Sequence, residues 1–554
     1  MDIFIRYFSE GGSQISSSLE NEDYVLTVTE RGERTSVMIT PKKPITLEDA
    51  FISEEFDFEE DCRIFLNGYQ SWTETREFSF GESLHNMNRI IPAIKKKFHF
   101  ENYGDAWFYK YNKNHFHGFT YSYVRCADGR TYLVGSLNEE NAYMITHYNK
   151  PNHTILLRSD VEGKVLDSEF KLFDFVHYEG KMTDVVRRYF SHFGPCKAPQ
   201  VRGYTSWYLH YQDINEEKID AALDGIDADS FDLFQIDDGY ETFVGDWTDV
   251  DPAKFPDGLG PVVDKIHEKG LKAGIWLAPF VCETKSRVYA EHPDWIVRKD
   301  GDPVFAGSNW SGDVALDLTN PEALAYVRGC LEYFKDLGFD FFKLDFLYAA
   351  ALIAGSDSGG GLTRAEHMRS AMKLLREVLG DRLILGCGVP LSSAFGLVDY
   401  CRIGPDVSLR FDDAFYMRAF HRERISTKVT LQNTIFRTFM DGRVFRCDPD
   451  VFLLRDDNIK LSKKQRMALT VLNHLCGSVF MTSDNVGDYN ESKHKFLREA
   501  QKLAAADITD ITADGGVITV RFMLDGKKGK IQYDTEKGVL VNGQKHIRIW
   551  KSDR

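Results

Sequence analysis

Residues 340–350 read DFFKLDFLYAA and place a lysine and an aspartate two positions apart in an otherwise apolar run. Successive side chains of a β-strand point to opposite faces, so Lys343 and Asp345 are expected on the same face. A buried charge is costly unless it is paired or takes part in chemistry. The run therefore predicts a buried strand whose end carries functional side chains.

Similar strand segments recur between residues 200 and 490, and helical segments separate most of them. The eight predicted strands are YTSWYLH (204–210), FDLFQIDDGY (231–240), LKAGIWLAPF (271–280), FDFFKLDFL (339–347), LILGCGVP (383–390), DYCRIGPD (399–406), VFRCDPD (444–450) and GSVFMTSD (477–484). Repeated strand–helix units favour a (β/α)8 TIM barrel over an open sheet. The seventh strand has the weakest pattern.

Three of the intervening helices have clear start signals. The pairs Thr363–Glu366 and Ser462–Gln465 have the spacing of a capping box, and both helices end on glycine. Asn320 is a favourable N-cap and is followed by Pro321 in the first turn. These signals predict helices over 321–337, 364–379 and 463–476.

The barrel is expected over residues 196–505, between two β-rich regions. Residues 1–195 alternate apolar and polar positions, as in DYVLTVTERGERTSVMIT, with turn residues between segments, which favours a β-sandwich. Residues 506–554 contain short alternating segments such as GGVITVRFML and KHIRIW, which predict a small antiparallel β-domain. The predicted fold class is therefore α/β, a TIM barrel flanked by two β-domains.

The composition limits the classes of partner. The 554 residues carry a formal net charge of −16, with 43% hydrophobic and 27% charged residues, as in an ordinary soluble globular protein. A negative chain without a long basic run disfavours nucleic acid and anionic membranes as partners. The sequence shows neither a long apolar span nor the pattern of a signal peptide, so we expect no membrane association.

The nine cysteines are scattered, with no CxxC pair. They stand at positions 62, 126, 196, 282, 330, 387, 401, 447 and 476. An odd, unpatterned set argues for reduced thiols, a cytoplasmic location and the absence of a zinc site. We expect no cofactor and no metal, and the sequence is compatible with a homo-oligomer without predicting one.

Polar side chains gather where the predicted barrel strands end, which is where TIM barrels have their active sites. They are Asp237 and Asp238 of strand two, Lys343 and Asp345 of strand four, Cys387 of strand five, Arg402 and Asp406 of strand six, and Trp207 and Trp276 of strands one and three. Each alone has an ordinary explanation as a helix cap, ion pair or core residue. Their coincidence at one end of the barrel favours a functional site.

This set of side chains suits glycoside hydrolysis. That reaction needs two separated carboxyl groups, one to attack or stabilise the anomeric centre and one to protonate the leaving oxygen. Tryptophan faces suit the apolar side of a sugar ring, and further charged groups suit its hydroxyls. Lys343 beside Asp345 would keep that aspartate ionised, whereas the acid needs a raised pKa.

Seven motifs in order resemble those of glycoside hydrolase family 36, the microbial α-galactosidases. They are GYQSW, GYTSWY, FQIDDGYE, GIWLAPF, FFKLDFL, ILGCGVP and RIGPD, and the likeness runs from about residue 60 to the end of the barrel. The resemblance implies a retaining α-galactosidase that acts on chain ends of oligosaccharides such as melibiose and raffinose, through a covalent glycosyl-enzyme and without a metal.

The resemblance also implies roles. Asp345 of FFKLDFL is expected to be the nucleophile and Asp406 of RIGPD the general acid/base. The expected substrate-binding residues are Asp237 and Asp238 at the 4- and 6-hydroxyls, Lys343 and Arg402 at C2 to C4, Cys387 and Gly388 beside C2, Trp207 and Trp276 as pocket walls, and Trp72 of GYQSW, which would close the pocket from the β-sandwich.

Two other readings remain open at this point. An α-N-acetylgalactosaminidase of the same family would need more room near Cys387 and Gly388. A metal-dependent lyase or isomerase would use Asp237, Asp238 and Asp345 to hold magnesium and Lys343 as a base. A sugar-binding protein without activity is disfavoured because both candidate catalytic aspartates are present.

Overall fold

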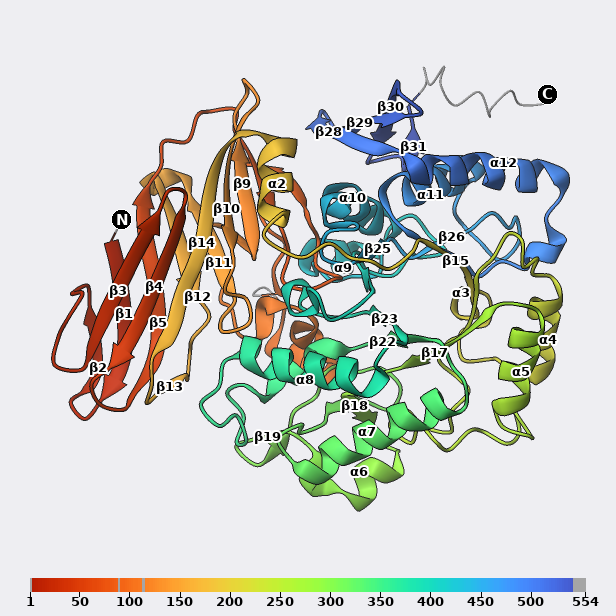
Figure 1. Ribbon diagram of the computed structural model, residues 1–554, viewed down its shortest axis with the longest axis horizontal. Coiled ribbons are helices and arrows are strands. Elements are labelled where there is room, and N and C mark those ends of the chain that lie inside the picture. Colours follow the sequence, from red (N-terminus) through yellow and green to blue (C-terminus); the bar gives the residue numbers. More distant parts are fainter. Residues whose placement is uncertain (1, 88–89, 112–114, 542–554) are drawn as a thin grey trace.

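The computed structural model describes residues 2–87, 90–111 and 115–541, and its N-terminal part is a β-sandwich (Figure 1). One sheet consists of β2 (Gly12–Ser16), β1 (Asp2–Ser9), β5 (Ile45–Glu55), β12 (Thr154–Ser159), β11 (Met144–Asn149) and β8 (Phe116–Phe119), with β13 (Val165–Leu166) beside β5. The other consists of β3 (Tyr24–Arg31), β4 (Arg34–Pro41), β14 (Phe170–Lys181), β10 (Arg130–Ser136), β9 (Tyr121–Arg125), β6 (Arg63–Leu66) and β7 (Arg76–Ser79).

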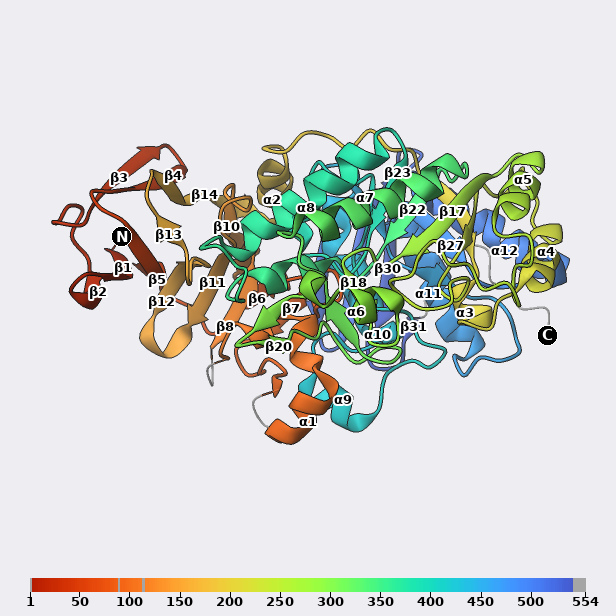
Figure 2. The same cartoon turned by 90° about the horizontal axis from the view of Figure 1, so that it is seen from below.

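The alternating sequence explains the sandwich. In β1, Ile3, Ile5 and Tyr7 are buried while their neighbours are more exposed, so one face of the strand supplies the core. The segment after β7, which includes α1 (Pro92–Phe98), leaves the sheets and reaches the barrel (Figure 2). There the ring of Phe100 lies 5.6 Å from that of His421.

The barrel is a parallel sheet whose strands follow the predicted order. They are β15 (Val201–Thr205), β16 (Leu233–Ile236), β17 (Lys272–Leu277), β22 (Phe341–Leu344), β23 (Leu383–Gly386), β24 (Tyr400–Arg402), β25 (Arg446–Asp448), β26 (Val451–Phe452) and β27 (Val479–Thr482). The prediction of a TIM barrel flanked by β-domains is confirmed.

The seventh barrel strand is interrupted. β25 pairs with β24 and β26 pairs with β27, and only Pro449 and Asp450 separate the two pieces. Proline lacks the N–H that a sheet ladder needs, and Asp450 has a left-handed φ of 70°. Both residues break the strand, so the two pieces together act as strand seven and close the circle of eight. The weak sequence pattern of this strand follows from that break.

Helices cover the barrel, and α2 (Met182–Phe190) packs against β10 and β14 of the sandwich. Besides α1 they are α2 (Met182–Phe190), α3 (Trp207–His210), α4 (Glu216–Asp224), α5 (Gly260–Glu268), α6 (Arg287–Glu291), α7 (Pro321–Asp336), α8 (Arg364–Leu379), α9 (Phe415–Phe420), α10 (Thr427–Arg437), α11 (Lys463–Cys476) and α12 (Glu491–Gln501). The capping boxes of α8 and α11 and the Asn320 cap of α7 are confirmed.

The predicted barrel strands were too long at their C-terminal ends. The largest difference is in strand one, where the chain turns into α3 after Thr205, so Trp207 lies on a short helix and not on a strand. Asp345 and Cys387 each follow the last strand residue directly, and Asp406 lies in the loop beyond β24.

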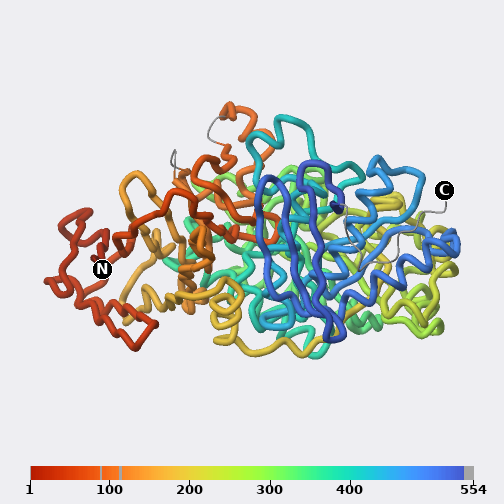
Figure 3. The backbone as a smooth tube through the Cα atoms, turned by 90° about the horizontal axis from the view of Figure 1, so that it is seen from above, coloured from red at the N-terminus to blue at the C-terminus, as the bar shows by residue number. Residues whose placement is uncertain are grey.

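The C-terminal part is a four-stranded antiparallel sheet that runs across the barrel (Figure 3). Its strands are β28 (Asp507–Asp514), β29 (Val517–Leu524), β30 (Lys527–Asp534) and β31 (Val539–Leu540). The predicted strand KHIRIW, residues 545–550, lies outside the described residues. The division of the chain at residues 195 and 505 stays a prediction.

Short antiparallel pairs complete the described elements. β18 (Val281–Glu283) pairs with β21 (Asp313–Ala315), and β19 (Arg298–Lys299) pairs with β20 (Asp302–Pro303). These pairs lie in the long insertion between β17 and β22. Among the described helices none is both long and apolar enough to span a bilayer.

Candidate functional site

The C-terminal ends of the barrel strands bring a buried lysine against a buried aspartate. Lys343 of β22 lies with its Nζ 2.9 Å from Oδ2 of Asp237, which directly follows β16. Gln235 and Thr205 donate to the same oxygen at 2.6 and 3.0 Å. The direct hydrogen bond of the lysine is thus to Asp237, while the proposed influence of Lys343 on Asp345 stays a prediction. Barrel side chains meet in layers built from alternate strands, which explains the contact between strands two and four.

Asp345 is buried, and its carboxylate accepts hydrogen bonds from two N–H groups. Nε1 of Trp276, from β17, lies 3.2 Å from Oδ2, and the backbone N–H of Phe346 lies 2.8 Å from Oδ1. Phe346 has a left-handed φ of 53°, so the chain turns sharply directly after the aspartate. Asp345 also contributes to the raised pKa of Lys343, which places its carboxylate near that ammonium. The carboxylate is thus held by fixed donors on neighbouring elements.

Asp406 has a different environment. Nη1 of Arg402 lies 2.9 Å from Oδ1 of Asp406, and about a third of the aspartate side chain (33%) remains exposed. Burial at the barrel mouth raises the pKa of Asp406 to about 6, with further contributions from the negative charges of Asp450 and Asp345. Arg402 and Lys343 oppose this shift. Since Asp345 acts on Asp406 electrostatically, the two candidate catalytic groups share one region.

Asp238 follows Asp237 and faces a different set of partners. Its carboxylate accepts from Nε2 of Gln212 at 3.1 Å and from Nε1 of Trp310 at 3.0 Å. Burial raises the pKa of Asp238, and a hydrogen bond with the neighbouring carboxyl of Glu241 opposes that shift. Burial and Asp238 together raise the pKa of Glu241 well above its ordinary value. Burial and the charge of Asp238 therefore both favour the neutral form of Glu241.

Trp72 reaches the barrel from the sandwich. Its ring lies 5.4 Å from that of Phe346 and 5.7 Å from that of Tyr348, both of which follow β22. The backbone N–H of Ser71 donates to the carbonyl of Val389 at 3.0 Å, directly beyond Gly388. A side chain of the sandwich therefore lies against residues that follow β22, and closure of the pocket by Trp72 stays a prediction.

A buried arginine fixes the loop that carries Trp72. Arg437 of α10 donates to the side-chain oxygen of Asn67 at 3.1 Å and to backbone carbonyls of the segment 68–71 at 2.7 to 3.4 Å. It also donates to the carbonyl of Ile403, just after β24, at 2.9 Å. All five N–H groups of one guanidinium are thus used to join the sandwich loop to the barrel.

Gly388 permits the close approach of Trp72. A Cβ at this position would lie 2.9 and 3.0 Å from atoms of the indole and 3.1 Å from the backbone nitrogen of Phe346. The glycine also has a φ of +53°, which L-residues rarely adopt.

We expect Gly388→Ala to displace Trp72 and to raise KM about tenfold or more for any substrate bound beneath the indole, with a smaller change in kcat. Quenching of tryptophan fluorescence during substrate titration would measure the weaker binding. Gly396→Ala is the matched control, because a Cβ there would meet no atom within 4 Å, whereas its φ of +70° is left-handed like that of Gly388.

The remaining predicted residues lie around the same strand ends. Arg402 binds Asp406, and the buried thiol of Cys387 has a pKa raised by burial and by the charges of Asp345 and Asp406. Trp207 on α3 lies 5.1 Å, ring to ring, from Tyr211, whose pKa is raised by burial and also by the charge of Asp406. Trp207 is therefore at the edge of the site, without a direct polar contact to the aspartates among the described residues.

Sequence reasoning missed several residues of this site. They are Tyr208, Glu241, Trp310, Asp448 and Asp450. Asp448 and Asp450 could have been found, because they end the predicted strand seven just as Asp237 and Asp238 end strand two. Trp310 lies in an irregular segment between β20 and β21. The sequence of this segment has no hydrophobic periodicity from which an inward-facing residue could be predicted.

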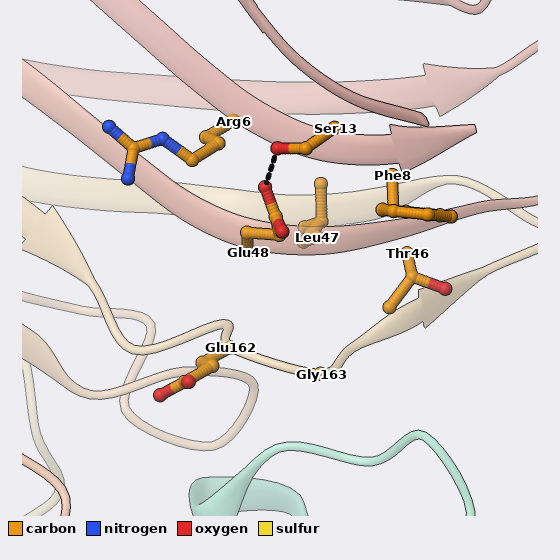
Figure 4. Close-up of a pocket in the computed structure, with 8 residues that line it drawn as sticks. All are labelled: Arg6, Phe8, Ser13, Thr46, Leu47, Glu48, Glu162 and Gly163. Carbon is orange, nitrogen blue, oxygen red and sulfur yellow. Dashed lines mark hydrogen bonds between the residues drawn. The ribbon is translucent and has the colours of Figure 1, made fainter. Parts of the chain in front are cut away.

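The donors around the aspartates bear on the metal reading. Each of Asp237, Asp238 and Asp345 is bonded to N–H or ammonium donors, as described above, and no group of described residues with metal-ligand spacing includes any of the three. The group with metal-ligand geometry in the described part of the chain is Glu59 with Cys62 and Cys126, in the sandwich. The cavity of Figure 4, lined by Arg6, Glu48, Glu162 and five neighbours, also lies in the sandwich and contains none of the predicted site residues.

Comparison with known proteins finds similarity to glycosidases. The family model described as melibiase matches residues 189–365. Alpha-galactosidase Mel36A of Lactobacillus acidophilus is 36% identical over 103 residues, which cover 17% of this chain and 14% of that protein. Alpha-xylosidase XylQ of Lactiplantibacillus pentosus is 30% identical over 184 residues, which cover 31% of this chain and 23% of that protein. The matched stretches span less than a quarter of these two relatives.

Solved structures match over much more of the chain. The α-galactosidase TtGalA from Thermus thermophilus, in complex with p-nitrophenyl α-D-galactopyranoside, has a TM-score of 0.72 at 25% identity and covers 95% of this chain and 98% of that chain. The α-galactosidase AgaA from Geobacillus stearothermophilus has a TM-score of 0.61 at 11% identity and covers 95% of this chain and 80% of that chain. The second match shows a shared fold alone.

Proposed function

We propose that the chain is a member of glycoside hydrolase family 36, since the melibiase model matches residues 189–365 and TtGalA matches over 95% of the chain, and that it is a retaining α-galactosidase that removes terminal α-D-galactosyl residues from oligosaccharides. The observation that carries the proposal is a pair of carboxyl groups with unlike environments at one barrel mouth. Asp345 accepts two N–H donors, whereas Asp406 has a raised pKa and is partly exposed.

The proposed reaction has two displacements at the anomeric carbon. Asp345 attacks this carbon while Asp406 gives its proton to the departing glycosidic oxygen, so the carbon–oxygen bond breaks as the ester to Asp345 forms. Asp406, now ionised, then takes a proton from a water molecule that attacks the same carbon from the face the leaving group left. The ester to Asp345 breaks, and galactose leaves with its α configuration retained.

The buried charges beside the nucleophile support recognition of hydroxyl groups. We assign the 4- and 6-hydroxyls to Asp237 and Asp238, and the hydroxyls at C2 to C4 to Lys343 and Arg402. A substrate without the matching hydroxyl would leave a buried charge without its partner, which discriminates strongly. The indole N–H of Trp72 is buried and has no hydrogen-bond partner within the described residues, so it is a further donor for a sugar oxygen.

A panel of substrates tests the proposal. It contains nitrophenyl α-galactoside, its 2-acetamido analogue, α-glucoside, α-xyloside and β-galactoside, with the first-formed anomer followed by ¹H NMR. We expect the α-galactoside to be preferred and α-galactose to appear first. Preference for the acetamido sugar would instead indicate an α-N-acetylgalactosaminidase, and preference for xyloside would agree with the similarity to XylQ. Loss of all activity with a chelator would contradict the metal-free mechanism.

The pH dependence has a defined sign. The acid must be protonated to donate, and its pKa is raised to about 6 from the ordinary value of an aspartate. We therefore expect kcat/KM for melibiose to be highest near or below pH 6 and to fall about tenfold per pH unit above it. A dinitrophenyl galactoside, whose leaving group needs little protonation, should show a flatter alkaline limb. Parallel profiles for both substrates would contradict the assignment of Asp406 as the acid.

The setting of the thiols supports a location in the cytoplasm. All nine cysteines are unpaired, eight of them are buried, and the sulfurs of Cys62 and Cys126 lie 3.7 Å apart. Reduced thiols persist in compartments kept reducing by glutathione or thioredoxin. Small oligosaccharides would then reach the enzyme after import.

A further inference from the structure

One guanidinium at the barrel mouth binds three carboxylates. Arg402 places Nη1 at 2.9 Å from Asp406, Nε at 3.0 Å from Asp448 and Nη2 at 2.9 Å from Asp450. Asp448 and Asp450 are almost completely buried. A single positive charge compensates one carboxylate, so this group has an excess of negative charge that favours binding of a proton by one of its members.

The hydrogen-bond donors decide which carboxylate takes the proton. Asp450 accepts from the hydroxyl of Tyr208, from the backbone N–H of Val407 at 2.7 Å and from Arg402. Asp448 accepts from the backbone N–H of Asp450 at 2.8 Å and from Arg402. The carboxylate of Asp406 has Arg402 as its one donor among the described residues. Burial raises the pKa of both Asp406 and Asp450, but within the described part of the chain Asp450 accepts three hydrogen bonds that favour its ionised form and Asp406 accepts one, so we infer that Asp406 is the member that is most readily protonated.

The break in strand seven makes this arrangement. Pro449 ends the pairing of β25, and the left-handed φ of Asp450 turns its side chain back towards Arg402 of the neighbouring strand. Tyr208, from α3 after strand one, donates its hydroxyl to the carboxylate of Asp450. Residues from strands six and seven and from the helix after strand one therefore form the surroundings of Asp406.

The other charged and titratable groups around Asp406 come from four further positions. Lys343 and Asp345 act on Asp406 from β22 and the turn beyond it. Tyr208 of α3, Tyr211 directly after α3 and Cys387 directly after β23 are affected by its charge. Lys343 is bonded to Asp237, and the thiol and phenols are neutral at physiological pH because burial raises their pKa values. Asp450 and Asp345 are thus the negative groups that contribute most to the raised pKa of Asp406.

We propose that Asp450 is a positioning residue for the acid/base: by occupying Nη2 of Arg402 it prevents the guanidinium from neutralising Asp406 alone, and Asp406 retains the proton that leaving-group departure requires. The effect on catalysis rests on the proposed function, whereas the effect on the protonation of Asp406 does not. Asp450 itself touches neither the sugar nor the reacting atoms in this assignment.

Asp450→Asn is a suitable test because it removes the charge with little change in shape. Asparagine tolerates the left-handed backbone, and its amide oxygen can accept the Tyr208 and Val407 bonds. We expect the alkaline limb of the kcat/KM profile for melibiose to move about one pH unit lower, which makes the variant about tenfold slower at pH 7. For a dinitrophenyl galactoside we expect a change of less than about threefold.

Tyr208→Phe is the matched control, since it removes a hydrogen bond from the same group but leaves the charge on Asp450. Its profile should stay within a few tenths of a pH unit of the parent. If Tyr208→Phe moves the limb as far as Asp450→Asn does, local disruption and not the charge of Asp450 accounts for the shift, and the inference fails. An unshifted profile for active, folded Asp450→Asn overturns it as well.

A measurement without turnover separates this inference from the proposed function. The ¹³C resonance of the Asp406 carboxyl, assigned by its loss in Asp406→Asn, can be titrated in the parent and in Asp450→Asn. A lower pKa in the variant supports the inference even if no galactoside is cleaved, in which case the proposed function alone fails. An equal pKa in both proteins refutes the inference whatever the activity.

Discussion

Replacing Asp345 by alanine is expected to lower kcat/KM by about 10⁴-fold or more for every α-galactoside, because no other group can form the glycosyl-enzyme. Substrates with excellent leaving groups should show the same loss of kcat/KM, because the attacking oxygen is absent from the variant. The loss should appear in single-turnover experiments as the absence of a burst of released phenol. A variant that keeps even one hundredth of the parent activity would refute the assignment of Asp345.

Chemical rescue by azide would test the role of Asp345 through the formation of a product, in addition to the loss of activity. Alanine leaves space beneath the anomeric carbon, and azide bound there would attack from the face opposite the leaving group. The product from a dinitrophenyl α-galactoside is then β-galactosyl azide, formed as the carbon–oxygen bond breaks. Asp441→Ala is the control, because Asp441 lies before β25 at the other end of the barrel strands and bonds to Cys447, Ser478 and Arg446. Its loss should lower Tm with little effect on kcat/KM.

The barrel could be predicted from the sequence because its signals are local. A capping box such as Thr363–Glu366 involves residues three apart, and a buried parallel strand is a short apolar run. The positions of the site residues followed from one rule, that functional groups gather at strand ends. Asp237, Asp345 and Arg402 were found in this way, although Arg402 is the last strand residue and the two aspartates lie just beyond their strands.

The partners of these residues could not be predicted, because partner choice is a tertiary property. Lys343 is two positions from Asp345, yet its ammonium bonds to Asp237 across an intervening strand. The spacing of a strand fixes the face on which a side chain lies but not which of several carboxylates it reaches. Trp310 shows the same limit more strongly, since its inward position depends on a φ of 49° in a loop without periodicity.

Asp406→Ala should separate the two chemical steps by the demand of the leaving group. General acid assistance contributes about 10²–10⁴-fold where a poor leaving group must be protonated. We therefore expect a loss of that size for melibiose, whereas a dinitrophenyl galactoside, which departs without a proton, should form the glycosyl-enzyme at a rate within about tenfold of the parent. Hydrolysis of that intermediate lacks its base, so the intermediate should accumulate and be visible by mass spectrometry of the intact protein.

Azide distinguishes the two aspartates by the configuration of the product. In Asp406→Ala the nucleophile Asp345 is still present, so azide attacks the β-linked glycosyl-enzyme and gives α-galactosyl azide, the opposite anomer to the product expected with Asp345→Ala. The alkaline limb of the pH profile should also disappear, because the group whose raised pKa produces it is gone. If both variants give the same anomer of the azide, the two carboxyl groups do not act on opposite faces of the sugar, and the double displacement is refuted.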